Sequence, residues 1–229
     1  METTYESITY RSASQINDAM LRVYNYMALA VASSAIVSLV VAASPLLMSV
    51  FFGPITKWIT IFAPLALCFI IPSMIGGTTS KNVALGLLLV FASVMGLSTS
   101  ALISMYTGAS VVTAFMGAFI LFATMSFYGY FTKQSLDSIG KYLMIGLVAI
   151  ILTSIVNIFL GNSMLQTIIS AIAIILFMAL TAYDTQRIRE DISVSSMDHR
   201  PEILGALSLY CNFINIFINL LQLFGNKDE

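Results

Sequence analysis

Residues Tyr142 to Tyr183, YLMIGLVAIILTSIVNIFLGNSMLQTIISAIAIILFMALTAY, contain no Asp, Glu, Lys, Arg or His, and the run ends against Asp184. A helix needs about 20 apolar residues to cross a bilayer core roughly 30 Å thick. The run is therefore long enough for two crossings. NIFLGNS, residues Asn157 to Ser163, interrupts it with a glycine and two asparagines, so we predict a turn there.

The composition of the whole chain also indicates a protein that is surrounded by lipid. Only 9% of its residues are charged and 59% are hydrophobic, and the mean hydropathy is +0.93, whereas a soluble domain carries about 25% charge. The net charge is −1, and no basic patch is present that would attract nucleic acid. We expect the lipid bilayer to be the main partner of a single transmembrane domain spanning residues 1–229.

Charge-free stretches divide the chain into helices. Lys81 to Lys133 also holds two spans, with a break at Gly108. No stretch alternates with period two, which excludes a β-barrel and leaves an all-α, polytopic integral membrane protein. Residues 1–24 form a predicted cytoplasmic tail, and Ser44 to Pro54 are too short to cross. The seven predicted helices lie near residues 25–44, 58–75, 83–104, 109–130, 142–160, 164–185 and 203–224.

Lysine and arginine predict the orientation, because they gather in cytoplasmic segments. With the N-terminus inside, only Lys57 and Lys227 lie outside. The cytoplasmic segments then hold Arg11, Arg22, Lys81, Lys133, Lys141, Arg187, Arg189 and Arg200. A re-entrant last segment, which would put both termini in the cytoplasm, moves only Lys227 and stays open as an alternative.

The chain lacks the parts of common enzymes. His199 is the single histidine, and neither clustered cysteines nor a glycine-rich phosphate loop occurs. Tyr183 and Asp184 match the dipeptide of intramembrane aspartyl proteases, but that reaction needs two carboxylates. No other acidic residue lies inside a predicted span. We therefore expect neither an enzyme nor a bound cofactor.

Small and polar residues form a stripe along the last predicted helix. Spacings of three and four place them on one face. They are Gly205, Ser208, Asn212, Asn215, Asn219 and Gln222. Amides cannot face lipid without a partner, so this helix should be buried. Ser208, Asn215 and Asn219 fit either a conduit lining or helix packing.

Asp184 has two interpretations. It can be a gate or an ion ligand inside the membrane, since ionisable residues at that depth are commonly functional. It can also form an ion pair with Arg187, three residues further along an interfacial helix end.

Four further motifs are LTAYDTQRI, LGALSLYCNFINIFINLLQLFGN, SFYGYFTKQSLDSIGKYL and NIFLGNS. Together they resemble the transmembrane Bax inhibitor motif family (Bax inhibitor-1-like), in its bacterial branch. The resemblance covers nearly the whole chain after Lys81. It implies a seven-helix bundle with the last helix central, in a bacterial inner membrane, and a pH-sensitive calcium leak.

The resemblance also implies a proton sensor made of two facing aspartates. The first falls on Asp184, which would bind Ca²⁺ transiently as the transported ion. The second falls on Asn212, where LYCNF replaces the family's LYLDF. The family's latch arginine has no counterpart in SMIGGTTSKN, which offers only Lys81 nearby. Some bacterial relatives resemble regulators of a membrane-anchored protease, so a non-conducting regulator is the alternative function.

Overall fold

The computed structural model describes residues 11–78, 80–195 and 199–228, and over these ranges it contains eight α-helices and no strand. Seven helices are long and apolar enough to cross a membrane. This confirms the all-α, polytopic class. The helices are α1 Ala13–Ala42, α2 Pro45–Phe51, α3 Thr56–Gly77, α4 Lys81–Ile103, α5 Gly108–Phe131, α6 Asp137–Leu160, α7 Ser163–Val194 and α8 Arg200–Phe224.

The first helix begins at Ala13, well before the predicted start near residue 25. Ser12 forms a capping box: its hydroxyl accepts the N–H of Gln15, and the Gln15 side chain accepts the N–H of Ser12. The predicted tail is thus helical from Ala13 on, while residues 1–10 lie outside the described residues. At 30 residues, α1 is about 45 Å long and exceeds a bilayer core.

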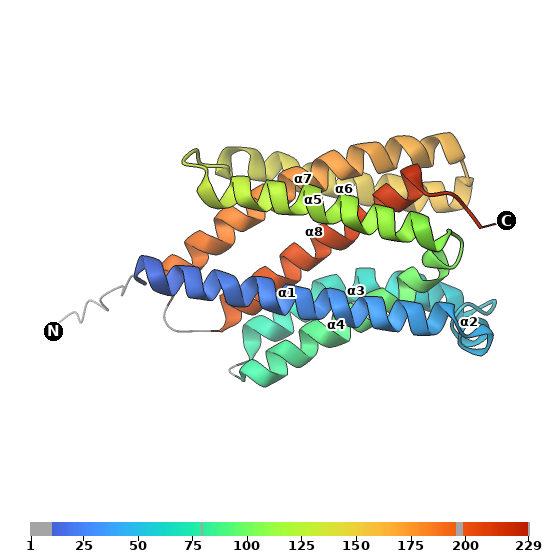
Figure 1. Cartoon of the computed structure of the whole chain (residues 1–229), viewed down its shortest axis with the longest axis horizontal. Coiled ribbons are helices and arrows are strands. Elements are labelled where there is room, and N and C mark those ends of the chain that lie inside the picture. The colour runs from blue at the N-terminus through green and yellow to red at the C-terminus, as the bar shows by residue number, and fades with distance from the viewer. Residues whose placement is uncertain (1–10, 79, 196–198, 229) are drawn as a thin grey trace.

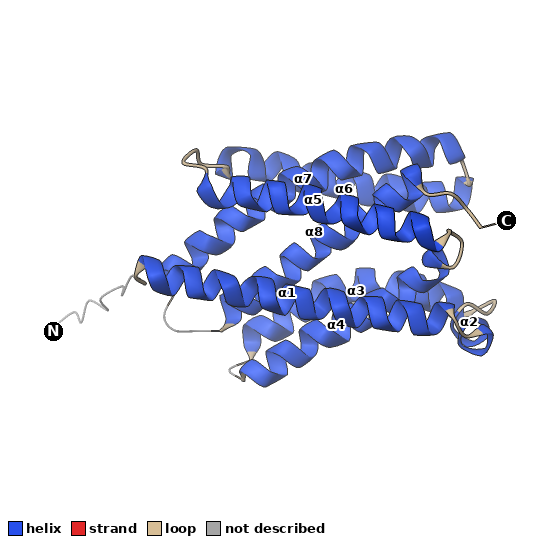
Figure 2. Cartoon of the chain, in the orientation of Figure 1, coloured by secondary structure: helices blue, strands red, loops and turns tan. Residues whose placement is uncertain are grey.

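The other boundaries follow the predicted breaks more closely. Gly161 ends α6 with a left-handed backbone, φ 63°, which glycine adopts without strain. The connection from Ser44 to Pro54 contains the short helix α2, capped by the Ser44 hydroxyl. Helix α7 continues past the predicted end near residue 185 to Val194, so it includes the charged segment from Arg187 to Asp191. Figure 2 shows that the loops lie at the two ends of the bundle.

The last helix runs through the middle of the molecule. In Figure 1, α1, α3 and α4 lie on one side, α5, α6 and α7 lie on the other, and α8 crosses obliquely between the two groups. In its most apolar stretch 67% of the α8 residues are buried, compared with 39% in α7 and 6% in α6. The expectation of a central last helix is confirmed.

The end of the chain places α8 across the full bundle. Asn226 accepts the N–H of Thr107 (3.0 Å), and the N–H of Asp228 donates to the Met105 carbonyl (3.1 Å). These bonds join the C-terminal segment to the α4–α5 loop, at the end opposite the start of α1 (Figure 1). The geometry therefore favours a complete crossing over a re-entrant segment.

Close helix packing depends on two glycines. A Cβ at Gly96 would overlap the Ser34 backbone, and a Cβ at Gly129 would overlap the Ala182 backbone. Small residues let membrane helices approach where no hydrophobic effect drives them together. Gly129 thereby holds α5 against α7 beside Asp184.

Candidate functional site

Asp184 projects from α7 toward α8 and is partly buried. Its Oδ2 accepts two hydrogen bonds, from Ser208 Oγ and from Asn212 Nδ2, both at 2.7 Å. Ser208 and Asn212 are four residues apart and therefore lie on one face of α8. The structure thus brings Asp184 and Asn212, on which the two facing positions of the family resemblance fall, into direct contact.

The two carboxylate oxygens of Asp184 differ. Both hydrogen bonds end on Oδ2, and among the described residues no donor binds Oδ1. Arg187 interacts with the carboxylate only electrostatically, and Cys211 of α8 is a further titratable neighbour. The site therefore consists of one carboxylate oxygen held by neutral donors on the central helix and one oxygen available to a cation or a proton.

Gly205 lets α7 and α8 meet at this point. A Cβ at Gly205 would lie 2.8 Å from Ile188 Cγ2. The glycine stands three residues before Ser208, and Ile188 stands four residues after Asp184, so this tight contact and the carboxylate belong to one interface. The close approach of α7 and α8 thus explains why the predicted stripe contains a glycine at position 205.

The rest of the stripe has other partners. Asn215 Nδ2 donates to the Cys211 carbonyl and Asn219 Nδ2 donates to the Asn215 carbonyl, each at 2.8 Å within α8. Gln222 Oε1 accepts from Gln166 Nε2 (2.7 Å) and Ser170 Oγ (3.2 Å) of α7. The Gln222 contacts join α8 to α7, whereas the Asn215 and Asn219 amides bond the backbone of their own helix. Among the stripe's described side chains, Ser208 and Asn212 bond Asp184.

Arg187 and Lys81 lie apart from the carboxylate. Arg187 is exposed, and its Nε is 3.9 Å from Asp191 Oδ2, one turn further along α7. The Lys81 ammonium lies 5.5 Å from the centre of the Tyr26 ring. Neither cation makes a hydrogen bond to Asp184 among the described residues.

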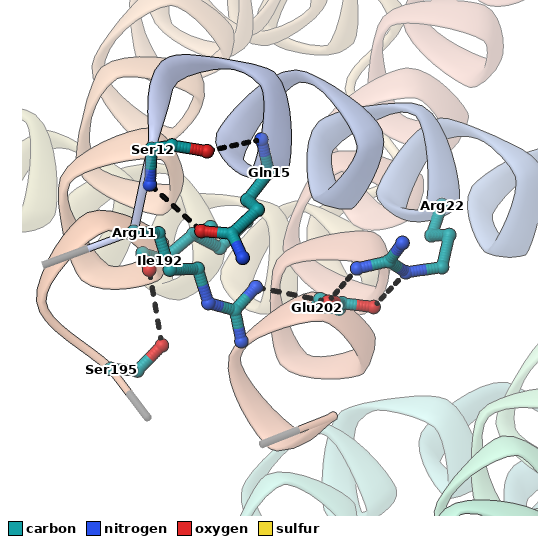
Figure 3. A network of polar contacts seen from close by, with 7 residues as sticks. All are labelled: Arg11, Ser12, Gln15, Arg22, Ile192, Ser195 and Glu202. Atoms are coloured by element: carbon teal, nitrogen blue, oxygen red, sulfur yellow. Dashed lines mark hydrogen bonds and ion pairs between the residues drawn. The ribbon is translucent and has the colours of Figure 1, made fainter. Parts of the chain in front are cut away.

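A second charged cluster holds the start of α8 (Figure 3). Glu202 is only 4% exposed. Its Oε1 lies 2.7 Å from Arg22 Nη2 and 3.3 Å from Arg11 Nη1, and its Oε2 accepts from Arg22 Nε at 2.8 Å. The Arg11 N–H also donates to the Ser193 carbonyl. We call this arrangement of Arg11, Arg22 and Glu202 the arginine clasp; it joins α1, the end of α7 and the start of α8.

Sequence reasoning missed the arginine clasp. Arg11 and Arg22 entered only as positive charges that set the orientation, and Glu202 stood just outside a predicted span at residue 203. Its one signal was a glutamate directly before a long apolar run. Pairing across 180 residues of sequence leaves no periodic pattern, so only the folded chain reveals it.

No group of three or more His, Cys, Asp and Glu side chains that could hold a metal ion occurs in the ranges 11–78, 80–195 and 199–228. Cys68 and Cys211 are free thiols. A cation at Asp184 would therefore have one carboxylate, neutral oxygens and water as ligands, which suits weak and transient binding.

The comparisons identify the family. The family model described as "Inhibitor of apoptosis-promoting Bax1" matches residues 16–229. The chain belongs to this family. Among its relatives, the inner membrane protein YbhL of Escherichia coli is 36% identical over 91% of each chain. An uncharacterised protein of Rickettsia prowazekii is 35% identical over 92% of this chain and 90% of its own.

A third relative, an uncharacterised protein of Deinococcus radiodurans, is 35% identical over 95% of this chain and 94% of its own. The resemblance seen in four motifs thus extends along almost the whole sequence. Together with the seven apolar helices, membership shows that this Bax inhibitor family protein is an integral membrane protein.

The arginine clasp should contribute to stability through Glu202. We expect Glu202→Gln to lower the free energy of unfolding by about 2 kcal/mol, because it leaves the buried positive charge of Arg11 without its carboxylate. The cost is moderate because Arg22 is partly exposed and can be hydrated instead. Denaturant unfolding of the purified protein in detergent measures this. Glu190→Gln, at an exposed glutamate of α7, is the control. Equal stability of both variants would show that the clasp contributes nothing.

Proposed function

We propose that this protein is a pH-sensitive calcium leak channel of a bacterial inner membrane, with no enzymatic activity and no bound cofactor. The observation that carries the proposal is the Asp184 carboxylate, which lies within the bundle and is held by Ser208 and Asn212 of the central helix. An ionisable group at this position is costly in a membrane and is commonly kept for function.

The geometry supports a role for Asp184 as gate and cation ligand. Movement of α8 away from α7 would lengthen the two bonds to Oδ2, because their donors lie on α8. Calcium binds oxygen ligands and prefers carboxylates, and Oδ1 is available to it. Asp184 thus couples the position of the central helix to the presence of a cation.

Protons would compete with calcium at the same group. Protonation removes the negative charge of Asp184 and turns one acceptor oxygen into a donor. The cation then loses its charged ligand, and the contacts with Ser208 and Asn212 weaken. Arg187 and Cys211 are the other titratable groups that interact with Asp184, and neither replaces its carboxylate.

A second candidate is a regulator that binds a membrane-anchored protease or another membrane protein. It is favoured by α6, in which the buried residues are Gly140 and Asn157. One face of this long helix packs on α7, but large apolar side chains such as Tyr142, Ile145 and Phe159 are exposed and available to a neighbouring protein. A regulator needs its partner, whereas a channel conducts alone, so calcium flux into liposomes containing only the purified protein separates the two functions.

Asp184→Asn tests the proposed gate. We expect the variant to fold and to lose most of the pH dependence of calcium flux, because the amide keeps the shape of the carboxylate without its titration. Flux into proteoliposomes is measured from pH 5 to pH 8. Asp191→Asn, which removes the exposed carboxylate beside Arg187, should behave like the wild type. An unchanged pH response of Asp184→Asn would refute the gate.

Asn212→Asp tests the facing residue on α8. Two close carboxylates resist double ionisation and titrate in coupled steps, whereas the Asn212 amide is neutral and only donates to Asp184. The variant should move the midpoint of the flux response to higher pH and steepen it between about pH 5 and 8. Asn215→Asp is the control, since the Asn215 amide bonds its own helix. Superimposable curves for Asn212→Asp and the wild type would contradict a shared site.

The orientation with the N-terminus in the cytoplasm is part of the proposal. A single cysteine in place of exposed Glu190, with Cys68 and Cys211 replaced by alanine, should react only with reagents delivered from the cytoplasmic side. A cysteine in place of exposed Asn226, at the other end of the bundle, should react from outside. Labelling of the first cysteine in intact cells by an impermeant reagent would reverse the orientation.

A further inference from the structure

A cleft of about 1100 Å³ lies between α1, α5 and Arg189 in the last turns of α7. Neither Asp184 nor any residue of α8 lines it. Its volume lies just above the usual range of ligand clefts, about 300–1,000 Å³. The cleft is therefore separate from the proposed gate and needs its own explanation.

One face of α5 forms the long wall of the cleft. Residues of α5 recur there at spacings of three and one from Phe119 to Phe131, which places them on a single stripe. At 1.5 Å per residue this wall is about 18 Å long. Phe119, Phe127 and Phe131 are 53%, 66% and 61% exposed. The cleft thus presents a long aromatic wall that opens toward the lipid.

The polar groups on the floor of the cleft already have hydrogen-bond partners. Tyr24 Oη and Ser126 Oγ are hydrogen bonded at 2.6 Å, and Ser126 Oγ and Thr185 Oγ1 are 3.1 Å apart. Thr185 in turn donates to the Thr181 carbonyl. This chain joins α1, α5 and α7 beneath the cleft. Since these hydroxyls bond one another, the depth of the cleft favours an apolar occupant.

The mouth of the cleft is cationic. Lys133 lies two residues beyond the end of α5, and Arg189 lies in the charged final turns of α7. Arg189 Nη1 donates to the Tyr130 carbonyl at 3.2 Å, and its guanidinium lies 5.1 Å from the centre of the Tyr130 ring. Tyr130 also donates its hydroxyl proton to Asn17 Oδ1. These contacts fix Arg189 at the rim.

The charges at the mouth have one sign. Among the described residues, the charged side chains that line the cleft are Lys133 and Arg189, and no acidic side chain lines it. Asp18 and Glu190 are sequence neighbours of lining residues but are exposed outside the cleft. An occupant that complements this surface has an apolar body and a negative head.

We propose that the cleft binds an anionic phospholipid, with an acyl chain along the aromatic wall of α5 and the phosphate between Lys133 and Arg189. Basic groups at the membrane surface attract anionic headgroups, and an exposed apolar wall in the membrane contacts acyl chains. The lipid would fill the space between α1 and α5 and brace Tyr24 against Ser126. This binding is independent of ion conduction.

Lipid titration of the purified full-length protein tests the proposal by native mass spectrometry. Phosphatidylglycerol and phosphatidylcholine with identical acyl chains are compared, and soluble glycerol phosphate is added in a separate arm. We expect tighter binding of phosphatidylglycerol and no competition from glycerol phosphate. The double variant Lys133→Gln, Arg189→Gln should weaken phosphatidylglycerol binding about tenfold or more.

Two further variants complete the test. Lys141→Gln removes a cation at the same end of the bundle. The Lys141 ammonium lies 5.0 Å from the centre of the Tyr142 ring and does not line the cleft. This variant should bind lipid like the wild type. Ala123→Trp places a bulky ring in the cleft from the α5 wall, where Ala123 is exposed. This variant should retain less of both lipids.

Three results would each overturn the proposal. Equal affinity for the two lipids would show that Lys133 and Arg189 do not bind the anionic headgroup. Equal losses in Lys141→Gln and in the double variant would show nonspecific attraction to the surface. Displacement of lipid by glycerol phosphate would indicate a site for free phosphate rather than for phospholipid.

Discussion

The constraint on which this fold depends is that the amide-bearing face of α8 cannot contact lipid. Asn212 and Asn219 are only 4% and 8% exposed, and each amide donates a hydrogen bond inside the protein. A helix with this face must be surrounded by other helices. The remaining long helices accordingly form two groups, and α8 crosses between them (Figure 1).

Polar contacts hold α8 along its whole length. The arginine clasp holds its first turn, Ser208 and Asn212 bind Asp184, and Gln222 meets Gln166 near its far end. Beyond α8, backbone bonds join the C-terminal segment to the α4–α5 loop. These contacts therefore lie at successive levels of α8, at its first turn, near its middle and near its far end.

Two acidic groups, Glu202 on α8 and Asp184 facing it from α7, are compensated in opposite ways. Glu202 has two arginines within 3.3 Å, so its charge is balanced in place. Asp184 has two neutral donors on Oδ2 and no guanidinium bonded to it among the described residues. A carboxylate balanced by cations is suited to holding a structure together, whereas one held by neutral groups responds to an arriving proton or cation. This contrast is the physical reason why the proposed gate is Asp184 and not Glu202.

The sequence by itself determined the features that depend on local composition. Charge-free runs gave seven spans, Gly161 gave the turn after α6, and the spacing from Gly205 to Gln222 required a buried last helix, because each pattern reflects the bilayer or the helical repeat. The motif resemblance indicated that Asp184 and Asn212 would meet.

Only the tertiary structure decided which distant side chains are partners. It extended α1 back to Ala13, paired Glu202 with Arg11 and Arg22, and opened the cleft between α1 and α5. It also separated the stripe into Ser208 and Asn212, which bond Asp184, and Asn215 and Asn219, which bond their own helix. These outcomes depend on how helices far apart in sequence pack together, and helical periodicity carries no information about that packing.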